Sequence, residues 1–261
     1  MGIKKLTAIM AAAAVMTMCG VTAAAETPAS VDFSSLSSES HGYGQGVECD
    51  EQNRPTGAIM FNDEYSVYDS YAIMENSSGV ILTFDQGYEN GYTESILDTL
   101  KEKDVKAVFF LTGDYAKRNR ELVKRMIAEG HIIGNHGMEH KSMPTLSPDA
   151  AKNEIMSLHD YVKQEYGVEM KYFRPPCGEY SERSLAVCQS LGYKTLLWSF
   201  AYCDWDVNNQ LDVNTAYAKA TSAAHDGAIY LLHSVSATNA EILPRVIDEL
   251  RAEGFRFTLP Q

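Results

Sequence analysis

The chain has 261 residues, of which 45% are hydrophobic, 10% aromatic and 22% charged. This composition is that of an ordinary globular protein, and it excludes a mostly disordered or collagen-like chain. The formal net charge is −13, from 22 Lys and Arg against 35 Asp and Glu, so long-range repulsion opposes non-specific binding to nucleic acid or to anionic membranes.

The first 25 residues are predicted to be a secretory signal peptide. Residues 1–5 are short and basic, residues 6–18 are apolar, and Ala23 and Ala25 occupy the −3 and −1 positions of a cleavage site. The apolar run is short for an uncleaved membrane anchor, and the residue before Cys19 is unsuited to lipidation of that cysteine. We therefore expect export, to the outside of the cell or to the cell-wall face of the membrane.

Residues 26–77 are rich in Ser, Gly, Tyr and acidic residues and show no sustained hydrophobic period. We interpret residues 26–46 as a flexible linker and the rest of this segment as an irregular arm packed on the domain. The catalytic domain is then predicted to span residues 78–261.

From Ser78 onward, short apolar runs alternate with amphipathic helices. Strands are predicted at residues 79–84, 105–111, 132–133, 172–173, 195–199 and 228–232. Helices are predicted from Thr93, around 122–127, from Ser147, over 181–191 and over 242–250. This alternation is typical of an α/β fold with a parallel sheet, closed or nearly closed as a barrel.

Polar side chains follow five of the predicted strands, where the chemistry of parallel α/β barrels gathers. They are Asp85 with Gln86, His136 with His140, Arg174, Asp204 with Trp205, and His233. Each is weak evidence alone, because an Asp after a strand is often a helix cap and a His-x3-His pair is often chance. Their order and their shared position at strand ends indicate a site.

In order, these segments resemble the five motifs of the carbohydrate esterase family 4 polysaccharide deacetylases, the NodB-homology domain, over residues 78–259. Residues 82–92, 130–136, 230–236 and 239–241 are similar to one branch, the delta-lactam-biosynthetic de-N-acetylases. The resemblance implies a distorted (β/α) barrel. It also implies an exported, metal-assisted enzyme that removes the acetyl group from N-acetylmuramic acid of peptidoglycan, in the route to muramic delta-lactam.

The resemblance implies a role for each residue of the set. His136 and His140 would hold a divalent metal, with zinc the expected ion, which activates water and polarises the amide carbonyl. Asp85 would be the general base that takes the proton of the water, and His233 the general acid that protonates the leaving nitrogen.

Further residues would orient this machinery or contact the sugar. Arg174 would hold the base ionised through a bidentate pair, and Asp204 would raise the pKa of the acid. Trp205 and Leu231 would wall the slot for the acetyl methyl, and Tyr88 would line the sugar groove.

The sequence departs from the family pattern at two places. Gln86 stands where the family carries a second Asp that ligates the metal, and an amide oxygen coordinates more weakly than a carboxylate. Cys177 stands where relatives in the muramic branch carry a basic residue suited to the lactyl carboxylate, so Arg183, with Lys171 behind it, is our candidate for that contact. Cys177 could also pair with Cys203, although nothing in the sequence supports the bond.

Three other functions stay open at this point. The first is deacetylation of N-acetylglucosamine in peptidoglycan or chitooligosaccharides, and the second is a non-catalytic glycan-binding domain that has lost its metal. A glycosidase using paired carboxylates is the third, and it leaves the histidine pair unexplained. We expect the glycan strand of peptidoglycan as the binding partner, with no nucleic acid and no stable protein partner.

Overall fold

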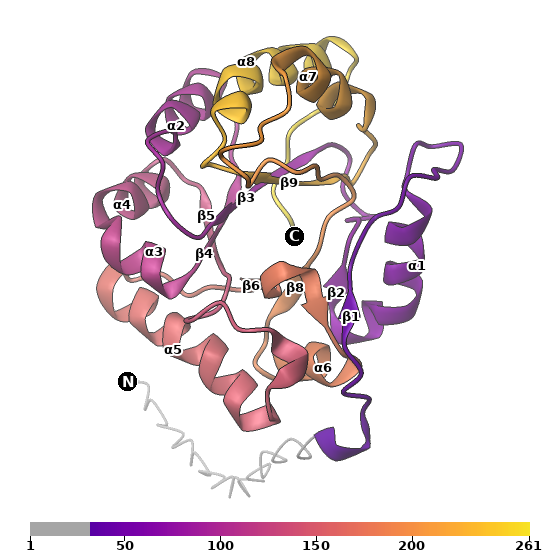
Figure 1. Ribbon diagram of the computed structural model, residues 1–261, viewed down its shortest axis with the longest axis vertical. Coiled ribbons are helices and arrows are strands. Elements are labelled where there is room, and N and C mark those ends of the chain that lie inside the picture. The colour runs from indigo at the N-terminus through magenta and orange to yellow at the C-terminus, as the bar shows by residue number, and fades with distance from the viewer. Residues whose placement is uncertain (1–31) are drawn as a thin grey trace, which may run out of the picture. The chain divides into compact units, whose positions relative to one another are not determined.

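The computed structural model describes residues 32–261, so the predicted signal peptide lies outside the described residues. Its main feature is a curled sheet of seven parallel strands in the order β2-β8-β6-β5-β4-β3-β9, which form a ring in Figure 1. The strands are β2 (Ser70–Tyr71), β3 (Ile81–Gln86), β4 (Val108–Leu111), β5 (Ile132–Asn135), β6 (Tyr172–Phe173), β8 (Lys194–Leu196) and β9 (Ile229–His233).

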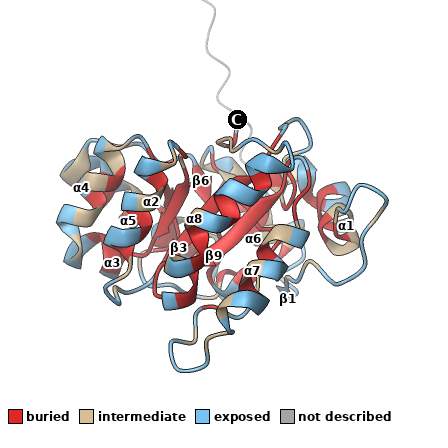
Figure 2. Cartoon of the chain, turned by 90° about the horizontal axis from the view of Figure 1, so that it is seen from above, coloured by how far each residue is buried: buried red, intermediate tan, exposed pale blue. Residues whose placement is uncertain are grey.

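Helices surround this ring of strands, with their buried faces toward it and their exposed faces outward (Figures 1 and 2). They are α1 (Thr56–Tyr65), α2 (Thr93–Glu102), α3 (Gly113–Arg118), α4 (Arg120–Ala128), α5 (Pro148–Tyr166), α6 (Glu182–Ser190), α7 (Val213–Ser222) and α8 (Ala237–Ala252). Short 3-10 turns cover Phe33–Ser35, Ser66–Tyr68, Met143–Thr145 and Pro176–Gly178.

The two ends of the curled sheet are joined by the chain that follows β8. There the backbone N–H of Leu231 donates to the carbonyl of Phe200 at 2.8 Å, and that of Ser199 donates to Ile229 at 2.9 Å. Residues 199–200 therefore pair with β9 past the short strand β2. The predicted distorted α/β barrel is confirmed.

Strand β3 shows how the sheet places the functional side chains. All six of its residues are buried, because one face packs on helices and the other fills the interior of the barrel. Leu82 and Phe84 belong to the core between sheet and helices, whereas Ile81 belongs to the interior cluster. Since side chains alternate along a strand, Asp85 shares the inward face with Ile81, and Gln86 shares the face of Phe84.

Residues 32–46 pack on the barrel, in contrast to our interpretation of residues 26–46 as a flexible linker, and residues 26–31 lie outside the described part of the chain. From Asp32 onward the chain forms one compact unit with the barrel. Strand β1 (His41–Gly42) pairs antiparallel with β7 (Glu179–Tyr180), and the ring of Tyr43 packs edge-on against Trp198 at 5.1 Å. Aromatic packing and strand pairing hold this segment, and neither leaves a hydrophobic period in the sequence.

Helix α1 was not predicted either. Its buried side chains lie at helical spacing: Ala58, Phe61, Asn62 and Tyr65. The polar Asn62 sits among them because its amide bonds the backbone of residues 72 and 73. None of the helices in residues 32–261 is long and apolar enough to cross a membrane.

Candidate active site

A cavity of about 920 Å³ opens at the carboxyl ends of the strands. Seven residues predicted from the sequence line it: Asp85, Tyr88, His136, His140, Trp205, Leu231 and His233. Asp85 and His233 are register partners on the adjacent parallel strands β3 and β9. Neighbouring strands lie about 4.8 Å apart, so the predicted base and acid stand side by side at one end of the barrel.

Arg174 occupies the barrel interior and is fully buried. Its Nη1 donates to Asp85 Oδ1 at 2.9 Å and to the Thr83 hydroxyl at 2.7 Å. Its Nε and Nη2 donate to the carbonyls of Leu196 and Leu197, at 2.9 and 3.0 Å. The pair with Asp85 is therefore single, not bidentate as predicted, because carbonyls at the end of β8 take the other donors of the guanidinium.

The position of Asp85 decides its protonation. Burial disfavours the carboxylate, but the positive charge of Arg174, with smaller contributions from His136 and His233, outweighs burial and lowers the pKa of Asp85. Arg174 holds one carboxylate oxygen, while the other, Oδ2, faces His136 Nε2 at 3.5 Å. The result is an ionised carboxylate with one oxygen directed to the histidine pair.

The two histidines face each other through their Nε2 atoms at 3.2 Å. Nδ1 of His136 lies 2.8 Å from the carbonyl of Arg174, which requires the proton on Nδ1 and leaves a lone pair on Nε2. Burial lowers the pKa of His136 to about 4 and also lowers the pKa of His140. Both rings are therefore neutral near pH 7, which is the form that binds metals.

Gln86, the third predicted metal ligand, is fully buried and does not line the cleft. Its Nε2 donates to the hydroxyl of Ser234, whereas its Oε1 is buried without a hydrogen-bond partner. The alternation along β3 explains this placement, since Gln86 shares the strand face of Phe84. An unpaired buried carbonyl oxygen is costly, and a cation would satisfy it.

These donors fit a divalent metal that accepts nitrogen and oxygen ligands. Among residues 32–261, no three His, Cys, Asp or Glu side chains converge in an arrangement that could hold a metal. Within these residues the two imidazoles His136 and His140 are the nitrogen donors that the cleft offers, and Gln86 lies behind them on the other face of β3. Imidazole nitrogens are common ligands of divalent transition metals, and a site without a carboxylate ligand holds such an ion less strongly than one that has it.

Glu154 of α5 supports the loop that carries the histidines. This buried carboxylate accepts hydrogen bonds from the backbone N–H groups of Glu139 at 2.7 Å and Lys141 at 3.4 Å, on both sides of His140. His140 itself has a left-handed backbone, with φ of 56°. Gly137 has a φ of 85°, a conformation that favours glycine, and a Cβ there would also lie 2.7 Å from Glu154 Oε1. Sequence analysis did not identify Glu154.

The acid half of the cleft is built around Asp204, which is fully buried. Asp204 Oδ1 lies 2.7 Å from His233 Nδ1, and Oδ2 accepts from the backbone N–H of His233 at 2.8 Å. Asn239 of α8, which sequence analysis placed in a motif without a role, donates to the same Oδ2 at 2.5 Å. Burial disfavours the imidazolium, but the charge and hydrogen bond of Asp204 outweigh burial and raise the pKa of His233.

The predicted substrate contacts are only partly brought together. Leu231 is buried in the cleft wall, whereas Trp205 and Tyr88 are 59% and 50% exposed and lie at the rim. Trp205 and Leu231 line the same cleft, and their predicted role as walls of the acetyl slot stays a prediction. Arg183 does not line the cleft: it lies on α6, where its backbone N–H donates to Ser37.

Lys171 does not support a substrate contact at the cleft, and Cys177 and Cys203 do not form the disulfide considered above. Lys171 precedes β6 and so lies at the opposite end of the strands. Within the described part of the chain, no Lys or Arg lines the cleft. Cys177 and Cys203 both line it, and they are free thiols.

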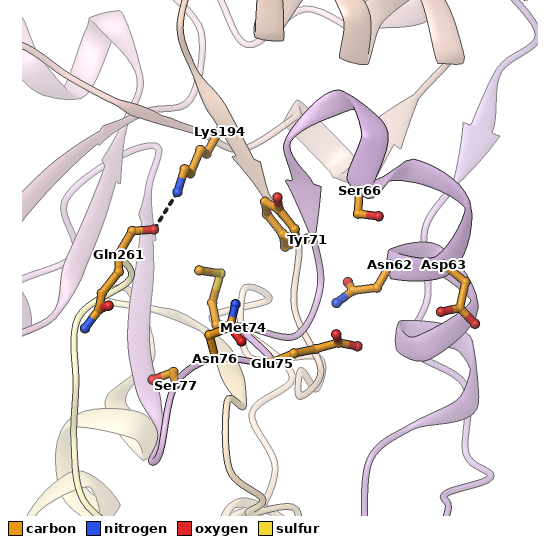
Figure 3. Close-up of a pocket in the computed structure, with 10 residues that line it drawn as sticks. All are labelled: Asn62, Asp63, Ser66, Tyr71, Met74, Glu75, Asn76, Ser77, Lys194 and Gln261. Atoms are coloured by element: carbon orange, nitrogen blue, oxygen red, sulfur yellow. Dashed lines mark hydrogen bonds between the residues drawn. The ribbon is translucent and has the colours of Figure 1, made fainter.

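A second pocket, of about 480 Å³, lies at the other end of the barrel (Figure 3). Lys194, the first residue of β8, points into it and donates to the Gln261 carbonyl at 2.7 Å, drawn as a dashed line. None of the predicted catalytic or metal residues lines this pocket. The predicted chemistry is therefore confined to the carboxyl ends of the strands.

Comparison with known proteins places this site in context. The model of the polysaccharide deacetylase family matches residues 74–196. Over 205 residues the chain is 42% identical to the peptidoglycan-N-acetylmuramic acid deacetylase PdaA of Bacillus subtilis, covering 78% of each chain. It is 33% identical over 190 residues to a peptidoglycan-N-acetylglucosamine deacetylase of Bacillus cereus, covering 71% of this chain and 68% of the relative. The solved structure of PdaA, a family 4 carbohydrate esterase, matches with a TM-score of 0.80 and 38% identity, over 86% of this chain and 96% of PdaA.

Proposed function

Because this chain belongs to the polysaccharide deacetylase family, we propose that it is an exported enzyme that removes the acetyl group from N-acetylmuramic acid residues of peptidoglycan, in the route to muramic delta-lactam. Deacetylases of this family are amide hydrolases, and so is this chain. The observation that carries the proposal is the register of Asp85 with His233 beside the histidine pair. Identity to PdaA supports muramic acid as the substrate, and the pattern of residues 1–25 supports export.

The residues of the cleft suit the two proton transfers of amide hydrolysis. Asp85, ionised beside Arg174, takes the proton of the attacking water. His233 carries a proton on the side of the ring away from Asp204 and gives it to the sugar nitrogen as the C–N bond breaks. Asp204 holds the ring in that orientation.

A divalent metal held by His136 and His140, with Gln86 as a candidate third ligand, would supply a Lewis acid that polarises the amide carbonyl and acidifies water. The two imidazoles are neutral, and their Nε2 atoms lie 3.2 Å apart in the cleft. The loop that carries His140 is held by backbone hydrogen bonds to Glu154.

Deacetylation of N-acetylglucosamine is the second candidate, and one observation favours it. The lactyl group of muramic acid carries a carboxylate when it bears no peptide, and no Lys or Arg of residues 32–261 lines the cleft to pair with that charge. The 33% identity to the N-acetylglucosamine deacetylase of Bacillus cereus also supports this second candidate.

The two remaining alternatives fit the site less well. A glycan-binding domain has no need of an ionised Asp85 beside an imidazole whose pKa is raised. A glycosidase needs two free carboxyl groups across the bond, whereas Asp85 is paired with Arg174 and Asp204 is fully engaged by His233 and Asn239.

The test is mass analysis of glycan products before and after incubation with the purified enzyme. We expect loss of acetyl groups from muramic acid residues of peptide-free glycan strands, abolished by a chelator and restored by a divalent metal. Chitooligosaccharides serve as the comparison substrate. Acetate release from chitooligosaccharides alone would replace the proposal by the glucosamine activity. Binding to strands without acetate release, whichever divalent metal is added, would favour the glycan-binding domain.

A further inference from the structure

The N-terminal arm contributes a wall to the active-site cleft. Tyr43, Gly44 and Gln45 line the cavity together with the catalytic residues, although the match to the family model begins only at residue 74. The arm is anchored by the β1–β7 pairing and by the hydrogen bond from Tyr43 N–H to the Gly178 carbonyl at 2.9 Å. It therefore belongs to the cleft of this chain without belonging to the matched domain.

Gln45 joins two residues of the opposite chain segment through both ends of its amide. Its Oε1 accepts a hydrogen bond from the Trp198 indole N–H at 2.9 Å, and its Nε2 donates to the carbonyl of Ala201 at 3.2 Å. Trp198 and Ala201 line the cleft on the chain that runs from β8 to Asp204. Both polar ends of Gln45 are thus engaged by the protein, which makes it a positioning residue for this wall.

Tyr43 holds the same tryptophan in two further ways. Its hydroxyl donates to the Trp198 carbonyl at 2.6 Å, and its ring meets the indole edge-on, with an interplanar angle of 89°. Trp198 and Gln45 are also tightly packed against two glycines. A Cβ at Gly178 would lie 2.7 Å from Trp198 Cη2, and one at Gly57 would lie 2.7 Å from the Gln45 carbonyl. These contacts hold the Trp198 indole in its position, and two of the residues that make them, Tyr43 and Gln45, belong to the arm.

We propose that Tyr43 and Gln45 fix the wall formed by Trp198 and Ala201 and thereby determine the affinity of the cleft for its glycan substrate. The inference rests on the proposed function, because it takes the substrate to be a glycan strand. The side chains of Tyr43 and Gln45 bond the Trp198 and Ala201 segment and not Asp85 or His233, so their loss weakens substrate binding and spares the chemical step.

The experiment compares Gln45→Ala and Tyr43→Phe with Gln52→Ala, an exposed glutamine of the same arm that does not line the cleft. For each protein we would measure the Kd for peptide-free glycan strands by tryptophan fluorescence, KM and kcat for acetate release, and Tm. Losing the hydrogen bonds of one neutral side chain is expected to raise Kd and KM about three- to tenfold for Gln45→Ala. Tyr43→Phe removes one bond and is expected to give a smaller rise, with kcat within about twofold for both.

The outcomes separate this inference from the proposed function. Unchanged Kd and KM in Gln45→Ala and Tyr43→Phe, or an equal rise in Gln52→Ala, would overturn the role of the arm. A fall in kcat and Tm at constant KM would do the same, because it shows a merely structural role. Should the wild-type enzyme release no acetate, the proposed function fails, and the Kd series alone still decides the inference. If Gln45→Ala does not fold, the single-atom change Tyr43→Phe carries the test.

Discussion

The acid half and the metal half of the cleft differ in how completely their polar atoms are satisfied. Around Asp204, both carboxylate oxygens and the inner nitrogen of His233 are hydrogen-bonded within the protein. In the metal half, by contrast, the Nε2 atoms of His136 and His140 face each other at 3.2 Å, and on the other face of β3 the Gln86 carbonyl oxygen has no partner among the described residues. The polar atoms of the acid half are satisfied within residues 32–261, whereas we expect a bound cation to satisfy those of the metal half.

This difference teaches where each kind of substitution should act. In the acid half, the neighbours of His233 set its charge, so changes there should alter proton transfer and its pH dependence. In the metal half, the neighbours of His140 set its position, so changes there should alter metal affinity first and catalysis as a consequence.

The largest expected effect is that of His233→Ala. Removing a general acid lowers kcat by about 10²- to 10⁴-fold. The histidine pair does not contact His233 through a hydrogen bond, so the affinity for zinc, measured by calorimetry, should stay as in the wild type. A loss of zinc binding in this variant would show that the two halves are not separate.

The next effect is that of Asp204→Asn, which tests how the acid is charged. The proposed general acid His233 acts in its protonated form, so we expect activity to be lost as the pH rises through its raised pKa. Without the Asp204 carboxylate the largest influence that raises this pKa is gone, while burial and Arg174 still lower it and only the charge of Asp85 still raises it, so the basic limb of the kcat/KM profile should move to lower pH. We expect kcat at the wild-type optimum to fall by roughly 10²-fold. An unmoved basic limb would mean that another group limits activity at high pH.

Glu154→Ala should produce a smaller change, confined to the metal half. Outer-shell partners of metal ligands are worth about 10- to 100-fold in metal affinity. Glu154→Gln keeps one acceptor for the N–H groups of residues 139 and 141 and should recover most of the zinc affinity. Asp160→Ala, an exposed acid of the same helix, is the control. Equal zinc affinities for Glu154→Ala and the control would refute the supporting role.

Gln86→Asp should give the smallest effect and one of opposite sign. A carboxylate is a stronger ligand than an amide, so zinc affinity should increase by a few-fold, measured by competition with a chelating dye. The hydrogen bond to Ser234 is lost, so Tm of the metal-free protein should fall while Tm with saturating zinc recovers. Weaker zinc binding in the variant would show that residue 86 is not part of the metal site.

The sequence allowed the barrel and the chemical residues to be predicted, because both follow local rules. Parallel strands end at a common edge, which placed Asp85, His136 and His233 together before any contact was known. The same rule should have excluded Lys171, which precedes its strand. Arg183 was chosen by nearness in sequence, and helix α6 holds it away from the cleft.

The parts that could not be predicted depend on contacts between distant segments. Gln45 and Trp198 are separated by 153 residues, and nothing near Gln45 in the sequence indicates that contact. Helix α7 was missed because its buried residues are only Ala216 and Ala220, which give a weak amphipathic signal. The unpaired oxygen of Gln86 is likewise a property of the folded chain, although the departure from the family pattern at this position was visible.

The buried Arg174 links the stability of the fold in acid to the predicted catalytic base. Its carboxylate partner is Asp85, whose lowered pKa stabilises the fold above the pKa of an unfolded aspartate, and this stabilisation is lost as the pH falls through the folded value. Protonation of Asp85 would then leave a guanidinium without a counter-ion inside the barrel. Protonation of Asp85 would thus both inactivate the enzyme and destabilise the fold. Loss of activity and unfolding in acid should therefore follow the same titration.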